Sequence, residues 1–444
     1  MATRPVTPAS DGSPREDHAA GTNGSGRARQ RAIAVGIDRG EWQIGGLDEI
    51  RELLRTAGVA TVGELVQSRS EPDPDRYLGR GKLAELKEVI KRKGANLIAC
   101  DDELAPRQER NLEAALGVPV IDRTAVILDI FADHAHSAEG KLQVELAQLE
   151  YNLARMRGLW THLERLGAGR MDGGIGTRGP GESQIETDRR LARDRITALR
   201  RRLAHKERNR DVMRARRERS HLPRVALAGY TNAGKSTLLN ALTGAGVGVG
   251  DRLFHTLDPT TRAYEHNGRR YLLTDTVGFI EKLPHQLVEA FKSTLEETIR
   301  GDLILHVVDC SGSPEAMAAR IAAVDSVLEE IGVGEHPRVL VLNKVDRVED
   351  AALRELELAN PGAVPVSAQE GVGLEVLRGR IEAEFAATLS AVELLVPYEE
   401  GGRLSDLHEL AGDLERDERA DGVLVRAMLP ASELYRFEDL RVSA

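Results

Sequence analysis

Apolar positions between residues 31 and 138 follow two alternating periods. Short apolar runs indicate strands at 31–36, from 61 onward, at 96–100 and at 118–121, and helical spacing indicates helices at 46–57, 82–93 and 104–116. Because strands alternate with helices, the pattern predicts a parallel sheet. This region has no phosphate-binding loop, so we expect it to bind a partner. Its glycine-rich, basic segment 77–82 is explained equally well as a simple loop before a helix.

Two heptad patterns follow, separated by a glycine-rich segment at 167–181. Apolar side chains alternately four and three residues apart form one seam at Leu142, Leu146, Leu149, Leu153, Met156, Trp160 and Leu163, and another at Ala192, Ile196, Leu199 and Leu203. The simplest arrangement is an antiparallel helical hairpin over 139–221 with the glycine-rich segment at its tip. That segment holds Arg170 and Arg178, which either become ordered on phosphate groups or belong to a plain flexible linker.

The remaining chain indicates two further units and a tail. Residues 222–388 contain several apolar strand-like runs, and the largely apolar run at 302–309 indicates an inner strand of a parallel sheet. Residues 389–444 indicate a small α+β unit, with strands at 393–397 and 423–429 and a helix at 403–416 between them. Residues 1–30 are polar and rich in Gly and Pro, so we expect them to be disordered.

The predicted fold class is therefore multidomain α/β. An N-terminal α/β domain (31–138) carries the long antiparallel hairpin (139–221). A central domain (222–388) has a mostly parallel sheet with helices on both faces, and a small α/β unit (389–444) ends the chain.

The central domain opens with a phosphate-binding loop. Residues 229–236 read G-Y-T-N-A-G-K-S directly after an apolar strand, which is the P-loop pattern in its proper context. Backbone N–H groups of such a loop surround the phosphates, the lysine reaches the terminal phosphates, and the serine hydroxyl binds Mg²⁺. The predicted phosphate-binding residues are Gly229, Tyr230, Thr231, Asn232, Ala233, Gly234, Lys235, Ser236 and Thr237.

A second motif identifies the base as guanine. The sequence N-K-V-D at 343–346 follows a strand, and a carboxylate at Asp346 can accept hydrogen bonds from guanine N1–H and the exocyclic amine. Adenine offers no such donor pair. S-A-Q at 367–369 follows another strand, and its backbone N–H is expected to contact guanine O6. The predicted base-binding residues are Asn343, Lys344, Val345, Asp346, Ser367, Ala368 and Gln369.

Two motifs between these loops indicate nucleotide-sensing switches. D-T-V-G at 275–278 follows an apolar strand, so we expect Asp275 to hold Mg²⁺ through water and the Gly278 N–H to sense the γ-phosphate. In the first switch, residues 254–262, Thr256 is the predicted Mg²⁺ ligand, with Thr260 and Thr261 as alternatives. The predicted switch contacts to GTP are Phe254, His255, Thr256, Leu257, Asp258, Asp275, Thr276, Val277 and Gly278.

No catalytic residue is certain, although Lys235 and Gly278 are candidates to stabilise the phosphates. Phe279 stands where Ras-like enzymes carry the glutamine that positions water, so we expect slow intrinsic hydrolysis. Asn232 matches the asparagine that binds K⁺ in potassium-stimulated GTPases. It is explained equally well as a residue that tolerates the backbone angles of the loop.

Charge is distributed unevenly along this 444-residue chain, whose net charge is −10. Residues 189–219 hold 14 Arg or Lys against 4 Asp or Glu, a net of +10, so the remainder carries −20. A basic block on an acidic protein favours contact with a polyanion, and a solvated helix face is the alternative. In this block, Arg189, Arg190 and Arg193 are candidates for RNA contact.

Composition limits the location of the protein. No apolar stretch approaches the roughly 18 residues of a membrane span, and the N-terminus has no apolar signal region, although peripheral membrane association stays open. Cys100 and Cys310 each follow a strand-like run, as expected of buried thiols in a reducing cytosol. We therefore expect a cytoplasmic protein.

Taken together, these residues resemble the HflX family of ribosome-associated GTPases, in the Obg–HflX branch. The most specific parts are the glycine-rich segment 173–188, the P-loop, F-x-T-L-D-P-T and D-T-V-G-F, and the resemblance covers nearly everything after residue 31. It implies GTP hydrolysis with Mg²⁺, binding to the large ribosomal subunit through the N-terminal domain, and contact of the glycine-rich helical region with ribosomal RNA. Some family members split stalled ribosomes. The polar tail is not explained by the resemblance.

We therefore expect a GTPase that binds rRNA and proteins of the large subunit, as a monomer when bound. One alternative is a GTPase switch that acts on a protein partner, with the heptad seam as a dimer interface. Another is a nucleotide-driven RNA-remodelling ATPase, which would need an adenine site that the sequence does not reveal.

Overall fold

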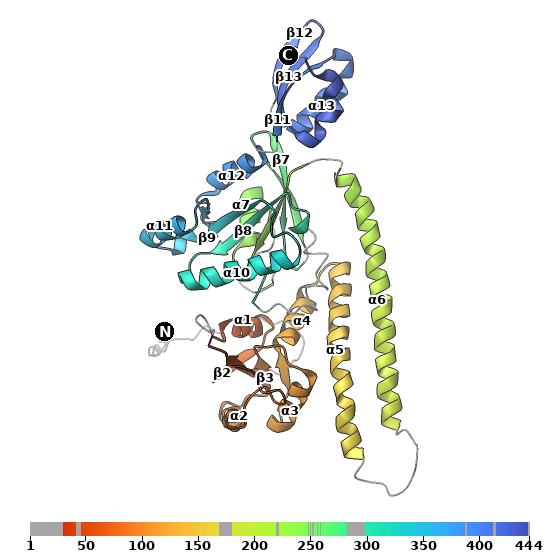
Figure 1. The fold of residues 1–444 in the computed structure, drawn as a ribbon, viewed down its shortest axis with the longest axis vertical. Coiled ribbons are helices and arrows are strands. Elements are labelled where there is room, and N and C mark those ends of the chain that lie inside the picture. Colours follow the sequence, from red (N-terminus) through yellow and green to blue (C-terminus); the bar gives the residue numbers. More distant parts are fainter. Residues whose placement is uncertain are drawn as a thin grey trace, which may run out of the picture.

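The computed structural model describes residues 30–40, 46–167, 180–218, 222–246, 248, 250, 253–254, 256–257, 259–281, 298–386, 389–411 and 414–442. Figure 1 shows the central domain between the N-terminal domain and the small C-terminal unit, with two long helices alongside. This arrangement confirms the predicted fold class. Within the described part, no helix combines the length and apolar character needed to cross a membrane.

The N-terminal domain is a four-stranded parallel sheet in the order β2-β1-β3-β4. Its strands are β1 (Arg31–Asp38), β2 (Ala60–Ser68), β3 (Leu97–Cys100) and β4 (Val120–Asp122), and its helices are α1 (Asp48–Thr56), α2 (Arg80–Lys93), α3 (Pro106–Leu116) and α4 (Arg123–His134). Helices α1 and α4 cover one face of the sheet, and α2 and α3 cover the other. Helix α3 starts two residues later than predicted because Pro106 favours the first helical position.

Helices α5 (Ala138–Gly167) and α6 (Pro180–Glu218) lie side by side, as Figure 1 shows. On α6, the predicted seam residues Ala192, Ile196 and Leu199 are buried. On α5, a different stripe packs against the N-terminal domain, because Val144, Ala147 and Tyr151 join its hydrophobic core. The seam residues Leu146, Leu149 and Leu153 are only half-buried, and the side chains of Trp160 and Leu163 lie outside the described part.

The central domain is a six-stranded sheet in the order β10-β9-β8-β5-β7-β6, parallel except for β6, which is antiparallel to β7. Its strands are β5 (Arg224–Gly229), β6 (Thr260–His266), β7 (Arg269–Asp275), β8 (Leu303–Asp309), β9 (Arg338–Asn343) and β10 (Val364–Val366). Helices α7 (Lys235–Thr243) and α12 (Leu374–Ala386) cover one face, and α10 (Pro314–Glu330) and α11 (Asp350–Ala359) the other. Burial on both faces explains the continuous apolar run of β8.

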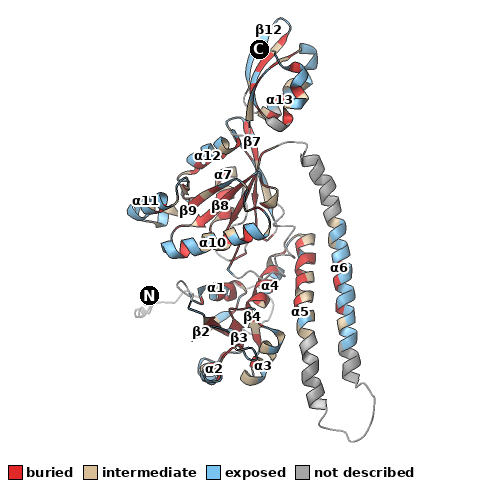
Figure 2. Ribbon diagram, in the orientation of Figure 1, coloured by how far each residue is buried: buried red, intermediate tan, exposed pale blue. Residues whose placement is uncertain are grey.

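The C-terminal unit is an antiparallel sheet in the order β11-β13-β12. It comprises β11 (Leu389–Val396), α13 (Gly401–Ala411), β12 (Glu415–Arg419), β13 (Gly422–Pro430) and a 3-10 helix (Ala431–Leu440). The helix predicted at 403–416 was too long, because Arg416 lies in β12. All five residues of β12 are exposed (Figure 2), so this edge strand lacks the apolar alternation by which a sequence indicates a strand.

Candidate functional site

The P-loop connects β5 to α7 through backbone angles that favour glycine. Gly229 has φ +154°, and a Cβ there would lie 2.2 Å from the carbonyl oxygen of Val307 on the neighbouring strand β8. Gly234 precedes α7 with φ +91°, and its Cβ would lie 2.3 Å from Nδ2 of Asn343. Asn232 also has positive φ, at +59°. The loop is therefore packed too closely against its neighbours to accept a side chain at either glycine.

Lys235 lies at the first position of α7 with its ammonium turned back into the loop. Its Nζ donates hydrogen bonds to the carbonyl oxygens of Gly229 (3.0 Å) and Tyr230 (2.9 Å). Burial lowers the pKa of Lys235 to about 8, although the nearby Asp275 carboxylate opposes the shift. A Cβ on Gly278 would lie 3.0 Å from this Nζ. The P-loop lysine and the predicted γ-phosphate sensor are thus brought together.

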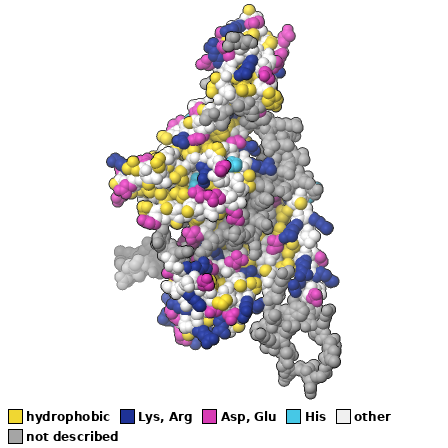
Figure 3. Space-filling model, viewed as in Figure 1, with side chains coloured by type: hydrophobic (Ala, Val, Ile, Leu, Met, Phe, Trp, Pro, Cys, Tyr) yellow, Lys and Arg dark blue, Asp and Glu magenta, His cyan; other side chains and the backbone are white. Residues whose placement is uncertain are grey.

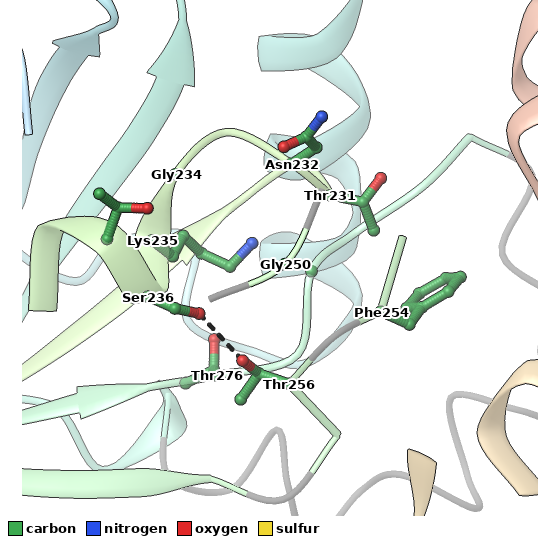
Figure 4. Close-up of a pocket in the computed structure, with 11 residues that line it drawn as sticks. Thr231, Asn232, Gly234, Lys235, Ser236, Gly250, Phe254, Thr256 and Thr276 are labelled. Atoms are coloured by element: carbon green, nitrogen blue, oxygen red, sulfur yellow. Dashed lines mark hydrogen bonds between the residues drawn. The ribbon is translucent and has the colours of Figure 1, made fainter. Parts of the chain in front are cut away.

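Three oxygen-bearing side chains converge beside the lysine. Ser236 Oγ lies 2.9 Å from Thr256 Oγ1, and Asp275 Oδ2 accepts hydrogen bonds from Ser236 (2.5 Å) and Thr256 (3.1 Å). Figure 4 shows the Ser236 and Thr256 hydroxyls pointing toward one another. The alternative Thr261 is instead paired with Thr274 across β6 and β7, at 2.9 Å.

These oxygens fit the requirements of Mg²⁺. Adjacent ligands of an octahedral ion with bonds of roughly 2.1 Å lie about 3 Å apart, which matches the spacing of Ser236 and Thr256. The second carboxylate oxygen of Asp275 is buried and has no hydrogen-bond partner in the described structure. Burial raises the pKa of Asp275, against the opposing charge of Lys235. A bound cation would favour the ionised carboxylate.

Asn343 ties the P-loop to the base-binding loop. Its Nδ2 donates to the carbonyl oxygen of Ala233 (2.8 Å), and its Oδ1 accepts from the Ala368 N–H (3.1 Å). The carboxylate of Asp346 is oriented by Ser367, whose hydroxyl donates to Oδ1 at 2.5 Å. The structure therefore brings together the two motifs that the sequence places about a hundred residues apart.

Lys344 is held by a residue that the sequence analysis missed. It has φ +69°, and its Nζ lies 2.8 Å from Asp309 Oδ2 at the end of β8. Burial raises the pKa of Asp309, but hydrogen bonds from Lys344 and Ser311 outweigh it and keep this pKa below its usual value. The ion pair fixes the stem of Lys344 where it could cover the base. An acidic residue at the end of an inner strand was the available signal for Asp309.

The pocket at the P-loop is small and partly open to solvent, with a cavity volume of about 60 Å³. Its lining (Figure 4) comprises Thr231, Asn232, Gly234, Lys235, Ser236, Thr237, Gly250, Phe254, Thr256, Thr276 and Gly278. Gly250 was not predicted, although it belongs to a glycine-rich run before the first switch. The hydroxyl of Thr231 is buried without a hydrogen-bond partner in the described structure, as is typical of a group that faces a bound ligand.

Several predicted nucleotide contacts have side chains that point elsewhere. The Tyr230 hydroxyl donates to Glu49 of the N-terminal domain at 2.6 Å. Leu257 and Val277 are buried in the core cluster of that domain, and Gln369 is exposed. The 3-10 helix Val345–Arg347 places Val345 in the base-binding loop. His255, Asp258, Arg170 and Arg178 lie outside the described residues.

Phe279 packs into the central domain under the P-loop. It is 1% exposed and belongs to the cluster formed by β8 and α10. Its backbone N–H donates to Gly229 and its carbonyl accepts from Thr231, which joins the second switch to the P-loop. A buried aromatic ring cannot orient water, so the chain offers no side chain at this position for activating the nucleophile.

The three RNA-contact candidates within the described residues lie along α6. Arg190 and Arg193 are exposed, whereas Arg189 is half-buried and its Nε–H has no hydrogen-bond partner in the described structure. Figure 3 shows the basic side chains gathered along the exposed side of this helix.

Three segments of the chain match families of GTP-binding proteins. Residues 45–132 match a family described as GTP-binding GTPase N-terminal, residues 134–217 one described as GTP-binding GTPase Middle Region, and residues 224–344 one described as 50S ribosome-binding GTPase. A solved GTP-binding protein of the archaeon Sulfolobus solfataricus, in complex with GDP, is 26% identical and covers 80% of this chain and 98% of that chain, with a TM-score of 0.41.

Relatives that match over most of the chain have higher sequence identity than this solved structure. The chain is 47% identical over 409 residues to a GTPase HflX of Lacrimispora saccharolytica, covering 91% of this chain and 95% of that protein. It is 44% identical over 394 residues to the GTPase HflX of Escherichia coli, covering 88% and 91%. With these relatives, and with a P-loop joined by Asn343 to the predicted base-binding loop, this chain belongs to the HflX family of GTPases and is a GTP hydrolase.

Proposed function

We propose that this GTPase binds the large ribosomal subunit and splits or rescues stalled ribosomes under stress. The observation that carries the proposal is the basic helix α6, on which Ala192, Ile196 and Leu199 are buried while Arg190 and Arg193 face solvent. The family described for residues 224–344 is named for 50S binding. Clustered arginines without bound protein carboxylates suit an RNA backbone, since they neutralise several phosphates at once.

The arginines of α6 are of two kinds, according to whether they form ion pairs with α5. Arg195 and Arg200 form ion pairs with Glu145 and Glu150 of α5, at 2.6 and 2.8 Å, and so align the two helices. For Arg190 and Arg193, no ion pair with another described side chain is present. We infer that the first pair serves the hairpin and the second contacts rRNA.

The hairpin supports RNA contact better than dimerisation. Ile196 and Leu199 are buried in the single chain, where α6 packs against α5, so they are not available as a dimer seam. An RNA-remodelling ATPase would require a base site different from the one that Asp346 and Ser367 form.

The test is co-sedimentation with purified large subunits in the presence of GDP, GTP or a non-hydrolysable GTP analogue. We expect binding with the analogue to fall steeply as salt rises and to weaken strongly when Arg190 and Arg193 are both changed to Glu. The control is the same double charge reversal at Arg354 and Arg416, which are exposed on α11 and β12. Equal binding by both double variants would contradict the proposal, as would absence from the subunit fraction with every nucleotide.

Ribosome contact is also our proposed source of catalytic activation. Because Phe279 is buried in the core, the group that positions water has to come from outside the second switch. We expect GTP turnover to rise when large subunits are added and the rise to disappear when residues 167–181 are deleted. An equal rise in the deleted protein would refute this role of the glycine-rich segment.

K⁺ is a second proposed activator, bound with the help of Asn232. What supports this role is that Asn232 lines the P-loop pocket, where its backbone has φ +59°. Equal turnover in K⁺ and Na⁺ buffers would refute the role.

Finally, we propose a cytoplasmic location, since both Cys100 and Cys310 are buried free thiols, and burial raises the pKa of Cys310 to about 11.

A further inference from the structure

The first switch is docked in the core of the N-terminal domain. Leu253, Phe254 and Leu257 are each at most 8% exposed, and all three belong to the hydrophobic cluster formed by α1, α4 and one face of the N-terminal sheet. These three residues flank Thr256, the candidate Mg²⁺ ligand. The domain that carries no nucleotide-binding motif thus contacts the segment that completes the nucleotide site.

Phe254 is the centre of this contact. Its ring meets Phe131 of α4 edge to face, with centroids 4.7 Å apart and an interplanar angle of 76°. Its carbonyl oxygen lies 2.8 Å from Nδ1 of His134, at the end of the same helix. On the other side, the Leu253 N–H donates to the Thr56 hydroxyl at 3.2 Å, at the end of α1. The switch backbone is therefore held from two helices.

The backbone of Phe254 shows that this docking opposes a local preference. Its φ is +56°, in the left-handed region that a bulky residue rarely adopts. Such a conformation persists only where surrounding contacts determine it. Here the contacts are those of Phe254 with Phe131 and His134, together with the bond from the preceding Leu253 N–H to Thr56. The turn they impose on Phe254 directs the chain so that Thr256, two residues on, reaches Ser236 at 2.9 Å.

We propose that Phe131 and Thr56 are positioning residues for GTP, because Phe131 holds Phe254 and Thr56 holds Leu253, and together they keep Thr256 at the Mg²⁺ site. In GTPases the first switch is ordered by contacts to Mg²⁺ and the γ-phosphate. By holding Thr256 in place, the N-terminal domain therefore favours the GTP form over the GDP form. By linkage, GTP must strengthen the docking of the first switch on the N-terminal domain by the same factor.

The test measures the affinity of the full-length protein for GDP and for a non-hydrolysable GTP analogue, each with Mg²⁺. We expect Phe131→Ala to lower the affinity for the analogue about three- to tenfold more than that for GDP, which is the range for an aromatic pair. Phe131→Leu keeps apolar contact and should restore part of the difference. Thr56→Val, which removes only the hydroxyl, should shift the ratio in the same direction.

A matched control separates positioning from simple destabilisation. Leu86→Ala creates a cavity in the same domain, in the core on the opposite face of its sheet, far from the first switch. It should lower thermal stability and leave the ratio of analogue to GDP affinity unchanged.

Hydrogen exchange gives a readout independent of binding. Amide protection at 253–257 should fall in Phe131→Ala and Thr56→Val but not in Leu86→Ala. The proposal is overturned if the affinity ratio stays the same in Phe131→Ala, if it rises, or if Leu86→Ala changes it equally.

Discussion

Asn343 offers the sharpest test of how the nucleotide site is assembled. It is 2% exposed and connects the P-loop to the base-binding loop through one donated and one accepted hydrogen bond. Asn343→Asp is nearly isosteric and keeps the acceptor for the Ala368 N–H. It replaces the donor toward Ala233 with an oxygen that faces a carbonyl oxygen.

The expected magnitude follows from those two bonds. Losing the bond to Ala233 costs about 0.5–1.5 kcal/mol, and burying two oxygens against each other costs about 1–3 kcal/mol more. If the P-loop and the base-binding loop move apart to relieve this repulsion, the lost free energy appears as weaker nucleotide binding. A loss of about 2 kcal/mol weakens GDP binding about 30-fold. Protonation of the introduced carboxyl restores a donor, so the defect should shrink as pH falls.

The assay is GDP affinity by titration calorimetry, with thermal unfolding measured in parallel. Asn360→Asp is the matched control, because Asn360 Nδ2 also donates to a backbone carbonyl, that of Leu356, at 2.9 Å. It lies at the end of α11 and should lose stability without losing GDP affinity. GDP binding by Asn343→Asp within twofold of the wild type would refute the role of Asn343 in joining the two loops.

The remaining predictions concern stability. Burial lowers the pKa of His306 to about 4 from 6.5, so as pH falls the unfolded chain takes up a proton before the folded chain does. Between pH 6.5 and 4 the free energy of unfolding should therefore drop by about 1.4 kcal/mol per pH unit. In His306→Leu, the free energy of unfolding should depend less steeply on pH. A wild-type slope no steeper than that of the variant would contradict this. Gly229→Ala should destabilise by about 3 kcal/mol or more, since its Cβ would meet Val307, whereas Gly379→Ala, in open space within α12, should stabilise by up to about 1 kcal/mol; equal melting temperatures would contradict both.

Most elements of the N-terminal domain and the inner strands of the central domain were predictable, because burial leaves a periodic pattern in the sequence. The apolar run of β8 and the helical spacing of α2 correspond to the clusters that they form. Helix α4 was missed, because it is buried by α1, α5 and the first switch, and its apolar residues therefore do not form a single stripe. Strand β12 was missed for the opposite reason, since it buries nothing.

Site residues within one continuous loop could likewise be predicted from the sequence, whereas partners distant in the sequence could not. The P-loop and the base-binding loop are continuous segments, so their residue types and spacing alone predict which backbone contacts phosphate and guanine. The partner of Lys344 is a residue 35 positions away, at Asp309, and Tyr230 bonds to a residue 181 positions away, at Glu49. No local pattern connects residues so far apart.

The sequence by itself determined that this chain binds guanine nucleotides and lacks the usual catalytic glutamine, because each conclusion depends on neighbouring residues in one loop. Only the tertiary structure decided that Thr256, and not Thr261, meets Ser236 and Asp275. The physical reason is that the position of Thr256 is set by the packing of Phe254 on Phe131. That contact joins two domains and exists only once both have folded.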